Sequence, residues 1–239
     1  NNSPSSDSAN SSLVNKCNIT LLWSKAVPFA FTVWLLGAIL VFGANINGYV
    51  RFLRQIKKTN RDADEEENEI LHALLQSHKF AVRRSVTIVR NPYVAAPMTI
   101  GIARPYIILP DRPFSRKQIQ NILLHELVHV KRLDVAAKWL TMLASSVHWF
   151  NPFLIWIRKE INHACELACD EIVVRGFSNQ EKQDYGDTLI SIVSTGRYPL
   201  GVLQATMSED KKALKDRLTA IMNHGKKSKL ILVLSGILL

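Results

Sequence analysis

Cysteine is scarce in this chain, and its scarcity excludes the small disulfide-stapled proteins. Three cysteines among 239 residues do not make a disulfide framework. Cys165 and Cys169 are four residues apart and would share one helix face. Two cysteines at that spacing could bind a metal, but we interpret both as buried thiols in a reducing compartment. Cys17 would lie on the opposite side of a membrane.

Acidic residues are also few, with 20 Asp and Glu against 30 Lys and Arg and a formal net charge of +10. A basic balance can indicate nucleic-acid binding, but the chain lacks a basic helix with interleaved aromatic residues. Its basic residues gather beside apolar runs instead, at residues 51–61 and 226–229. We therefore expect no direct contact with nucleic acid.

Charge is absent altogether from one long stretch. Residues 27–49 contain no Asp, Glu, Lys or Arg, and this stretch is long enough to cross a bilayer. Pro28 and Gly37 within it are tolerated by membrane helices. A signal peptide fits poorly, because a Ser- and Asn-rich segment precedes the stretch and no cleavage pattern follows it. The sequence therefore predicts a transmembrane helix at residues 23–50.

The flanking charges predict how this helix is oriented. Basic residues follow it directly, so the positive-inside rule places residues 51–229 in the cytoplasm and residues 1–22 outside, as a disordered linker. Residues 230–239 form a second apolar run, about half the length of a span, which we expect to begin a further transmembrane helix. The chain starts at Asn1 rather than Met, and we expect further residues at both ends.

The strongest chemical signal is His-Glu-Leu-Val-His at residues 125–129. His125 and His129 share a helix face, so both imidazoles can reach one Zn²⁺. Glu126 is then placed to take a proton from a water on the metal. Ser115 and Gln118 form a capping box that starts this helix at about Arg116. The surrounding residues are apolar, which predicts a buried helix whose polar groups need a partner such as a metal.

A zinc site of this type needs a third protein ligand, and Glu166 is the best candidate. Asp170 lies four residues later on the same helix face and can orient one of the two histidines. The alternatives for the third ligand, left open by the sequence, are Glu160, His163 and Glu171.

The remaining patterns predict a mainly helical α+β fold with a small β-sheet. An acidic start indicates a helix over residues 62–79, and short strands are predicted at residues 86–89, 98–102 and 106–109. An exposed edge strand beside the motif helix could bind an extended substrate, although a plain structural hairpin explains the same pattern.

Three further helical segments follow from the apolar pattern and the caps. Residues 135–157 are strongly apolar, which fits either two core helices docked at the membrane surface or a segment that dips into the membrane; we favour the core helices. Ser178 and Glu181 cap a helix that carries Tyr185, a candidate hydrogen-bond donor to the oxyanion. Another helix is expected to begin at Ser208.

Four strings in this chain, in this order, resemble one known family: residues 101–110, 125–134, 149–152 and 166–170. They are similar to the BlaR/MecR family of membrane-embedded zinc metallopeptidases, the antirepressor peptidases of bacterial β-lactam signalling. The resemblance covers the chain from about Val27 onward. It implies a gluzincin-like peptidase domain on the cytoplasmic side of a multi-pass protein of the bacterial cell membrane.

The resemblance also implies roles for individual residues: zinc at His125, His129 and Glu166, Glu126 as general base, and Asp170 in support. The roles of Arg132 and Asp134 in the extended motif are less clear. Family members of the signalling type carry a penicillin-binding sensor domain after the last span, and none is present in this sequence.

The implied partners are a cytoplasmic transcriptional repressor as protein substrate, the chain itself, and membrane lipid, with a homodimer left open. Self-cleavage would fall in the loop before the last span, and we expect it within residues 203–210. Two alternatives remain: a general quality-control or maturation peptidase of the membrane, and a non-enzymatic receptor or scaffold that keeps zinc for structure.

Overall fold

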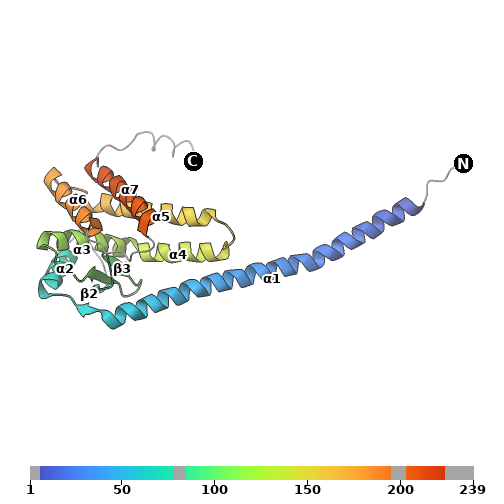
Figure 1. Ribbon diagram of the computed structural model, residues 1–239, viewed down its shortest axis with the longest axis horizontal. Helices are drawn as coiled ribbons and strands as arrows, with labels where there is room; N and C mark the ends of the chain where they lie inside the picture. The colour runs from blue at the N-terminus through green and yellow to red at the C-terminus, as the bar shows by residue number, and fades with distance from the viewer. Residues whose placement is uncertain (1–5, 78–83, 195–202, 224–239) are drawn as a thin grey trace.

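One long helix, α1 (Ser6–Thr59), extends away from a folded domain that contains the other described elements (Figure 1). The computed structural model describes residues 6–77, 84–194 and 203–223. Within these residues, only the part of α1 from Ser24 to Thr59 is long and apolar enough to cross a membrane. This agrees with the span predicted at residues 23–50, although the helix continues to Thr59.

The disordered linker predicted for residues 1–22 needs correction, because residues 6–22 belong to α1. Ser and Asn lower helix propensity only slightly, and no Pro or Gly interrupts the sequence between Ser6 and Val27. The helix therefore has nothing to end it before Pro28. The predicted span at residues 230–239 lies outside the described residues.

A four-stranded sheet follows α1, in the order β1-β2-β4-β3. Its strands are β1 (Arg61–Asp62), β2 (Thr87–Asn91), β3 (Met98–Ile100) and β4 (Tyr106–Pro110). The three longer strands match the three predicted from sequence, whereas the short strand β1 was not predicted. Strands β2 and β4 are parallel, and β3 pairs with β4 in antiparallel fashion as the edge of the sheet.

The turn between β3 and β4 requires a glycine. Gly101 has φ of +84°, and a Cβ there would lie 2.6 Å from the carbonyl oxygen of Arg104. Any side chain at this position would therefore strain the backbone and clash with it. This turn brings β3 back along β4 and leaves its outer edge beside the motif helix.

Six further helices complete the described part of the chain. They are α2 (Glu65–Gln76), α3 (Arg116–Arg132), α4 (Asp134–Val147), α5 (Phe153–Val173), α6 (Asn179–Ser194) and α7 (Leu203–Met222). Both predicted capping boxes are present. Ser115 accepts from the backbone N–H of Gln118 at 3.3 Å, and Ser178 accepts from that of Glu181 at 3.3 Å.

Two predicted helix boundaries are wrong. The helix expected over residues 62–79 is the shorter α2, because Arg61 and Asp62 pair with β2 as a strand. The helix expected from Ser208 begins at Leu203 instead, so residues 203–210 are helical and not a turn. No Pro or Gly stands between Leu203 and Met222, so the helix can extend through this stretch.

The apolar stretch at residues 135–157 forms two helices, as predicted, but they are not core helices. Leu140, Phe153 and Trp156 expose 68, 71 and 62% of their surface. The reason is their position: α4 lies along α1, and the turn between α4 and α5 extends away from the sheet (Figure 1).

Helix α3 occupies the centre of the folded domain. It contacts α2 and β3 on one side and α5 and α6 on the other (Figure 1). Leu123, Leu127 and Val128 are 0% exposed, and burying each such side chain stabilises the fold by about 2 kcal/mol. The buried helix predicted from the apolar neighbours of the motif is confirmed, and packing fixes it in place.

Candidate metal centre

Three side chains meet at one point between α3 and α5. His125 and His129 project from successive turns of α3, and their Nε2 atoms are 3.1 Å apart. Glu166 reaches across from α5, with Oε2 3.1 Å from His125 Nε2 and Oε1 3.5 Å from His129 Nε2. All three donor atoms lie within 4.8 Å of one another. Two imidazole nitrogens and one carboxylate are the donor set of a catalytic zinc site, so these residues fit zinc.

The electrostatics of this point also favour a cation. Burial alone would lower the pKa of both imidazoles, but hydrogen bonds to carboxylates outweigh it. The pKa of His129 rises to about 12 for this reason. Burial likewise opposes ionisation of Glu166, yet the two histidines and Arg217 hold its pKa far below the usual range. A metal dication would take the place of the protons that this cluster otherwise attracts.

Asp170 and Tyr185 both contact the Nδ1 atom of His125, on the side of the ring opposite Nε2. Asp170 Oδ1 lies 3.2 Å from His125 Nδ1, on the side of the ring away from the other donors. The Tyr185 hydroxyl lies 2.8 Å from the same nitrogen and donates to Asp170 Oδ1 at 2.7 Å. A carboxylate at Nδ1 holds the proton there and leaves Nε2 free for a metal. Asp170 therefore occupies the supporting position predicted from sequence.

Arg217, from α7, completes this network. Its guanidinium donates to both oxygens of Asp170, at 2.7 and 2.8 Å, and its Nη1 lies 3.3 Å from Glu166 Oε2. Burial raises the pKa of Asp170, but Arg217 and His125 outweigh this effect and bring that pKa down to about 2. Arg217 therefore contacts the carboxylates of both Glu166 and Asp170 and favours their ionised forms.

Asp134 supports His129 in the same way. Its Oδ2 lies 2.7 Å from His129 Nδ1, and it also accepts from the Cys169 thiol at 3.2 Å. Leu133, between α3 and α4, has φ of +63°, and this left-handed residue turns the chain so that Asp134 comes back against His129. Burial raises the pKa of Cys169 to about 11, so its sulfur remains a thiol donor.

Tyr185 is 1% exposed and engaged with Asp170 and His125 Nδ1. Burial, together with the neighbouring Asp170 charge, raises the pKa of its hydroxyl well above 10. The role predicted from sequence, donation to an oxyanion, needs a hydroxyl that faces the substrate. In the structure the hydroxyl contacts Asp170 and His125 while Tyr185 also lines the cavity, so donation to an oxyanion stays a prediction.

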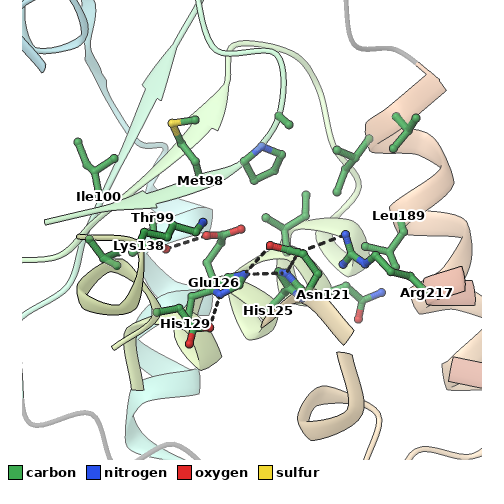
Figure 2. Close-up of a pocket in the computed structure, with 18 of the residues that line it drawn as sticks. Met98, Thr99, Ile100, Asn121, His125, Glu126, His129, Lys138, Leu189 and Arg217 are labelled. Carbon is green, nitrogen blue, oxygen red and sulfur yellow. Dashed lines mark hydrogen bonds and ion pairs between the residues drawn. The ribbon is translucent and has the colours of Figure 1, made fainter. Parts of the chain in front are cut away.

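Glu126 points away from these ligands, toward the edge strand β3 (Figure 2). The hydroxyl of Thr99 donates to Glu126 Oε2 at 2.7 Å. Thr99 is the middle residue of β3, so the strand and the candidate base are joined directly. A substrate strand that lay along the free edge of β3 would pass next to the carboxylate of Glu126.

A cavity of about 470 Å³ opens in front of the candidate metal ligands. Its walls come from β3, from the motif helix, from α6 and α7, and from α1 and α4 (Figure 2). The lining is mainly apolar, and its members include Met98, Ile100, Tyr49, Trp139 and Leu189. The size and chemistry suit a few side chains of a bound peptide.

The other candidates for the third ligand lie elsewhere. Glu160 and Glu171 are exposed, and His163 lies 3.8 Å from Asp216. The predicted set of His125, Glu126, His129, Glu166, Asp170 and Tyr185 is brought together, with Glu126 turned toward the cavity.

Sequence reasoning gave no role to two residues of the site, Thr99 and Arg217. It noted Asp134 in the extended motif without a clear role, and it interpreted Cys169 as a buried thiol, which its 0% exposure confirms. Asp134 carried a signal, because it follows His129 by five residues inside the extended motif. Arg217 carried none, since it lies 47 residues from its partner Asp170.

Comparison with known proteins gives a consistent result. The family model described as BlaR1 peptidase M56 matches residues 1–221. Regulatory protein BlaR1 of Bacillus licheniformis is 30% identical over 214 residues, which is 87% of this chain. Regulatory protein BlaR1 of Staphylococcus aureus is 22% identical over 217 residues, or 88% of this chain. Methicillin resistance mecR1 protein of Staphylococcus epidermidis is 26% identical over 163 residues, or 66%.

These relatives are much longer than the matched region. The alignments cover 35% of the Bacillus protein, 37% of the Staphylococcus aureus protein and 27% of the mecR1 protein. The chain thus spans about a third of the length of the curated relatives it matches.

Proposed function

Because this chain belongs to the BlaR1 peptidase M56 family, we propose that it is a membrane-anchored zinc metalloendopeptidase. One observation carries the proposal: two histidines and a glutamate converge as ligands, and a second glutamate faces an open cavity beside an edge strand. A structural zinc site would close its fourth position with protein, whereas here a cavity opens in front of the ligands.

His125, His129 and Glu166 would hold the metal. When bound, zinc supplies a Lewis acid that polarises the scissile carbonyl and lowers the pKa of water. Asp170 and Asp134 lie at the Nδ1 atoms of the two histidines and would hold the protons there, so each ring would present Nε2 to the metal. Tyr185 and Arg217 fix the position of Asp170 in turn.

Glu126 is the proposed general base. Its carboxylate takes a proton from the attacking water and then gives it to the nitrogen of the leaving amine. The Thr99 hydroxyl donates to Oε2 at 2.7 Å, which leaves Oε1 of Glu126 to face the water. The same hydrogen bond holds the base beside the strand on which the substrate would lie.

The substrate is proposed to bind as an extended strand. Among the described residues, β3 pairs only with β4, so its outer edge can accept a further strand. Backbone pairing recognises any extended peptide, and the apolar cavity would then select side chains.

The relatives are named as regulatory and methicillin-resistance proteins, and on that basis we propose regulatory substrates. The basic residues directly after the span favour a cytoplasmic peptidase domain. The proposed targets are a cytoplasmic transcriptional repressor and the chain itself. Because residues 203–210 are helical, self-cleavage there would require local unwinding of α7.

The test compares the full-length protein with its Glu126→Gln variant in membranes, measuring zinc content and mapping fragments of the chain and of added repressor. Zinc in both proteins and fragments from the wild type alone are expected, because the substitution removes the base but none of the ligands. His125→Ala serves as the control that loses both zinc and cleavage. Fragments of equal yield from Glu126→Gln would refute the assignment of the base.

A further inference from the structure

The turn between α4 and α5 carries apolar surface that the folded domain does not cover. We call residues 139–157 the hairpin tip; this stretch contains no Asp, Glu, Lys or Arg. Besides Leu140, Phe153 and Trp156, its exposed members include Phe150 at 59% and Ile155 at 67%. An aqueous surface rarely keeps an apolar patch of this extent.

The hairpin tip lies against the apolar part of α1. Trp34 Nε1 donates to the carbonyl of Val147 at 2.9 Å, and Trp149 Nε1 donates to the carbonyl of Trp34 at 3.2 Å. Gly37 permits this approach, because a Cβ there would lie 2.4 Å from the Trp149 ring. The turn is therefore level with the interior of the candidate span.

A second contact marks where the hairpin tip begins. Tyr49 and Trp139 meet edge to face, with ring centroids 5.0 Å apart. From Tyr49 back to Trp34, α1 rises by about 22 Å, at about 1.5 Å per residue. The hydrocarbon core of a bilayer is about 30 Å thick. If α1 spans the membrane, the hairpin tip reaches well into it.

Five backbone N–H groups in and beside the turn are paired within the protein. The backbone N–H groups of His148, Asn151, Leu154 and Ile155 donate to backbone carbonyls, and that of Phe153 donates to the Asn151 side chain at 3.0 Å. Pro152 has no N–H to satisfy. Non-helical backbone survives at membrane depth only where its polar groups are paired in this way.

The hydroxyl groups of α4 follow the same rule. Thr141, Ser145 and Ser146 each donate to a carbonyl one turn earlier, at 3.2, 2.7 and 2.9 Å. Such bonds pair the hydroxyl groups within the helix, so these groups need no partner from the surrounding hydrocarbon. Thr32 and Asn45 of α1 make equivalent bonds to Pro28 and Val41.

Basic residues stand at both ends of the hairpin tip. Lys138 precedes it and Arg158 follows it, and both line the cavity together with Tyr49 and Trp139. Arg51 follows Tyr49 by two residues on α1. Lysine and arginine are favoured where a helix leaves the hydrocarbon. At 14 residues, α4 is about 21 Å long and too short to cross. The chain therefore enters and leaves on one side.

We propose that the hairpin tip is a re-entrant membrane element whose exposed face is covered by lipid acyl chains. This inference rests on the membrane anchoring proposed above. It places the cavity, which is lined by Tyr49, Trp139 and Arg158, at the boundary between lipid and water. Peptide segments that emerge from the membrane beside α1 would then reach the ligands without crossing open solvent.

The test places one spin label at a time on the full-length protein in phosphatidylglycerol and phosphatidylethanolamine vesicles. Labels replace Phe150 and Phe153 in the hairpin tip, Leu40 on α1, and Tyr93 beside the sheet. Phe153, Leu40 and Tyr93 are matched in exposure, at 71, 71 and 69%. Cys17 is changed to Ser, and retention of zinc confirms the fold. Collision of the label with oxygen indicates that the label faces lipid. Collision with a water-soluble nickel complex indicates that it faces solvent.

We expect Phe150, Phe153 and Leu40 labels to meet oxygen and lose contact with nickel, while the Tyr93 label meets nickel freely. A Phe153 label as open to nickel as Tyr93, with Leu40 still protected, would overturn the re-entrant hairpin and leave the span intact. Labels at Phe150 and Phe153 shielded from both reagents would also overturn it, in favour of a second protein copy on this face. Nickel access at Leu40 would refute the membrane anchoring itself.

Discussion

At the scale of single residues, Thr99 is the contact that most directly concerns the proposed chemistry. Its hydroxyl bonds to the candidate base and its backbone belongs to the edge strand. It therefore ties the position of Glu126 to the strand on which a substrate would bind. No motif around residue 99 predicts this role, because the hydrogen bond joins residues that are 27 positions apart in the sequence.

Thr99→Val keeps the shape of the side chain and removes the hydrogen bond. A bond to a charged group is worth about 1.5–3 kcal/mol, so we expect the cleavage rate to fall by about tenfold or more. Zinc content should be unchanged, because Thr99 touches no ligand. The measurement is the rate of peptide cleavage at saturating substrate, with Thr99→Ser as the control that keeps the hydroxyl. Full activity in Thr99→Val would show that Glu126 needs no such support.

Arg217 offers a second test at this scale. Arg217→Met would leave Asp170, whose side chain is 1% exposed, without its cationic partner. Asp170 would then hold His125 less firmly, and partners of this kind contribute about 10- to 100-fold in metal affinity. We expect zinc affinity, measured by competition with a chelator, to fall within that range.

Lys215→Met is the matched control for this substitution, because Lys215 lies on the same helix and is exposed. It removes the same charge without touching Asp170, so its zinc affinity should equal that of the wild type. Equal losses in the two variants would mean that Arg217 acts only through the general charge of α7.

At the scale of elements, a buried ion pair joins α2 to β2, and we propose that it stabilises the domain. Glu67 is 1% exposed and bonds to Arg90 at 2.5 and 3.2 Å. Arg90 also donates to the carbonyl of Arg112 at 2.8 Å, beyond the end of β4. One guanidinium thereby joins the start of the domain to the segment that leads into α3.

We expect Glu67→Gln to lower the free energy of unfolding by about 3 kcal/mol, because removal of one partner leaves a buried charge uncompensated. Glu66→Gln is the control: its pair with Arg116 has side chains 52 and 65% exposed, and should contribute about 1 kcal/mol or less. Thermal unfolding in detergent measures the stability of both variants. A Glu67→Gln protein as stable as Glu66→Gln would contradict the proposed importance of this pair.

The sequence predicted elements well where local signals define them. The capping box at Ser115 started α3 at the expected residue, and that at Ser178 started α6. Boundaries failed where pairing partners decide them, as for β1, or where no Pro or Gly stops a helix, as at the start of α7. The core placement of residues 135–157 was wrong, because an apolar pattern does not show whether a helix face is buried in protein or left exposed.

At the scale of the whole molecule, the proposed metal would tie together the two helices that carry its ligands. His125 and His129 come from α3 and Glu166 from α5, so the metal would bridge them. A ligand that binds only the folded state stabilises it, by about 2.7 kcal/mol at one hundred times its dissociation constant.

We therefore expect a chelator to lower the midpoint of thermal unfolding of the wild type, and added zinc to restore it. Glu166→Ala removes one ligand, so its midpoint should respond much less to either treatment. Zinc-independent unfolding of the wild type would show that these residues do not bind the metal in the folded protein.

The sequence alone determined those features that depend on the spacing of nearby residues. A five-residue motif on one helix placed two candidate ligands and a candidate base, and a charge-free stretch defined the apolar part of α1. These features depend on helical periodicity and length, which are local properties.

The tertiary structure decided which distant groups meet. It brought Arg217 to Asp170, Thr99 to Glu126 and the hairpin tip to Trp34, across 47, 27 and 113 residues of chain. Such contacts depend on how helices and strands pack against one another. Packing is a property of the whole fold, which no local pattern along the chain encodes.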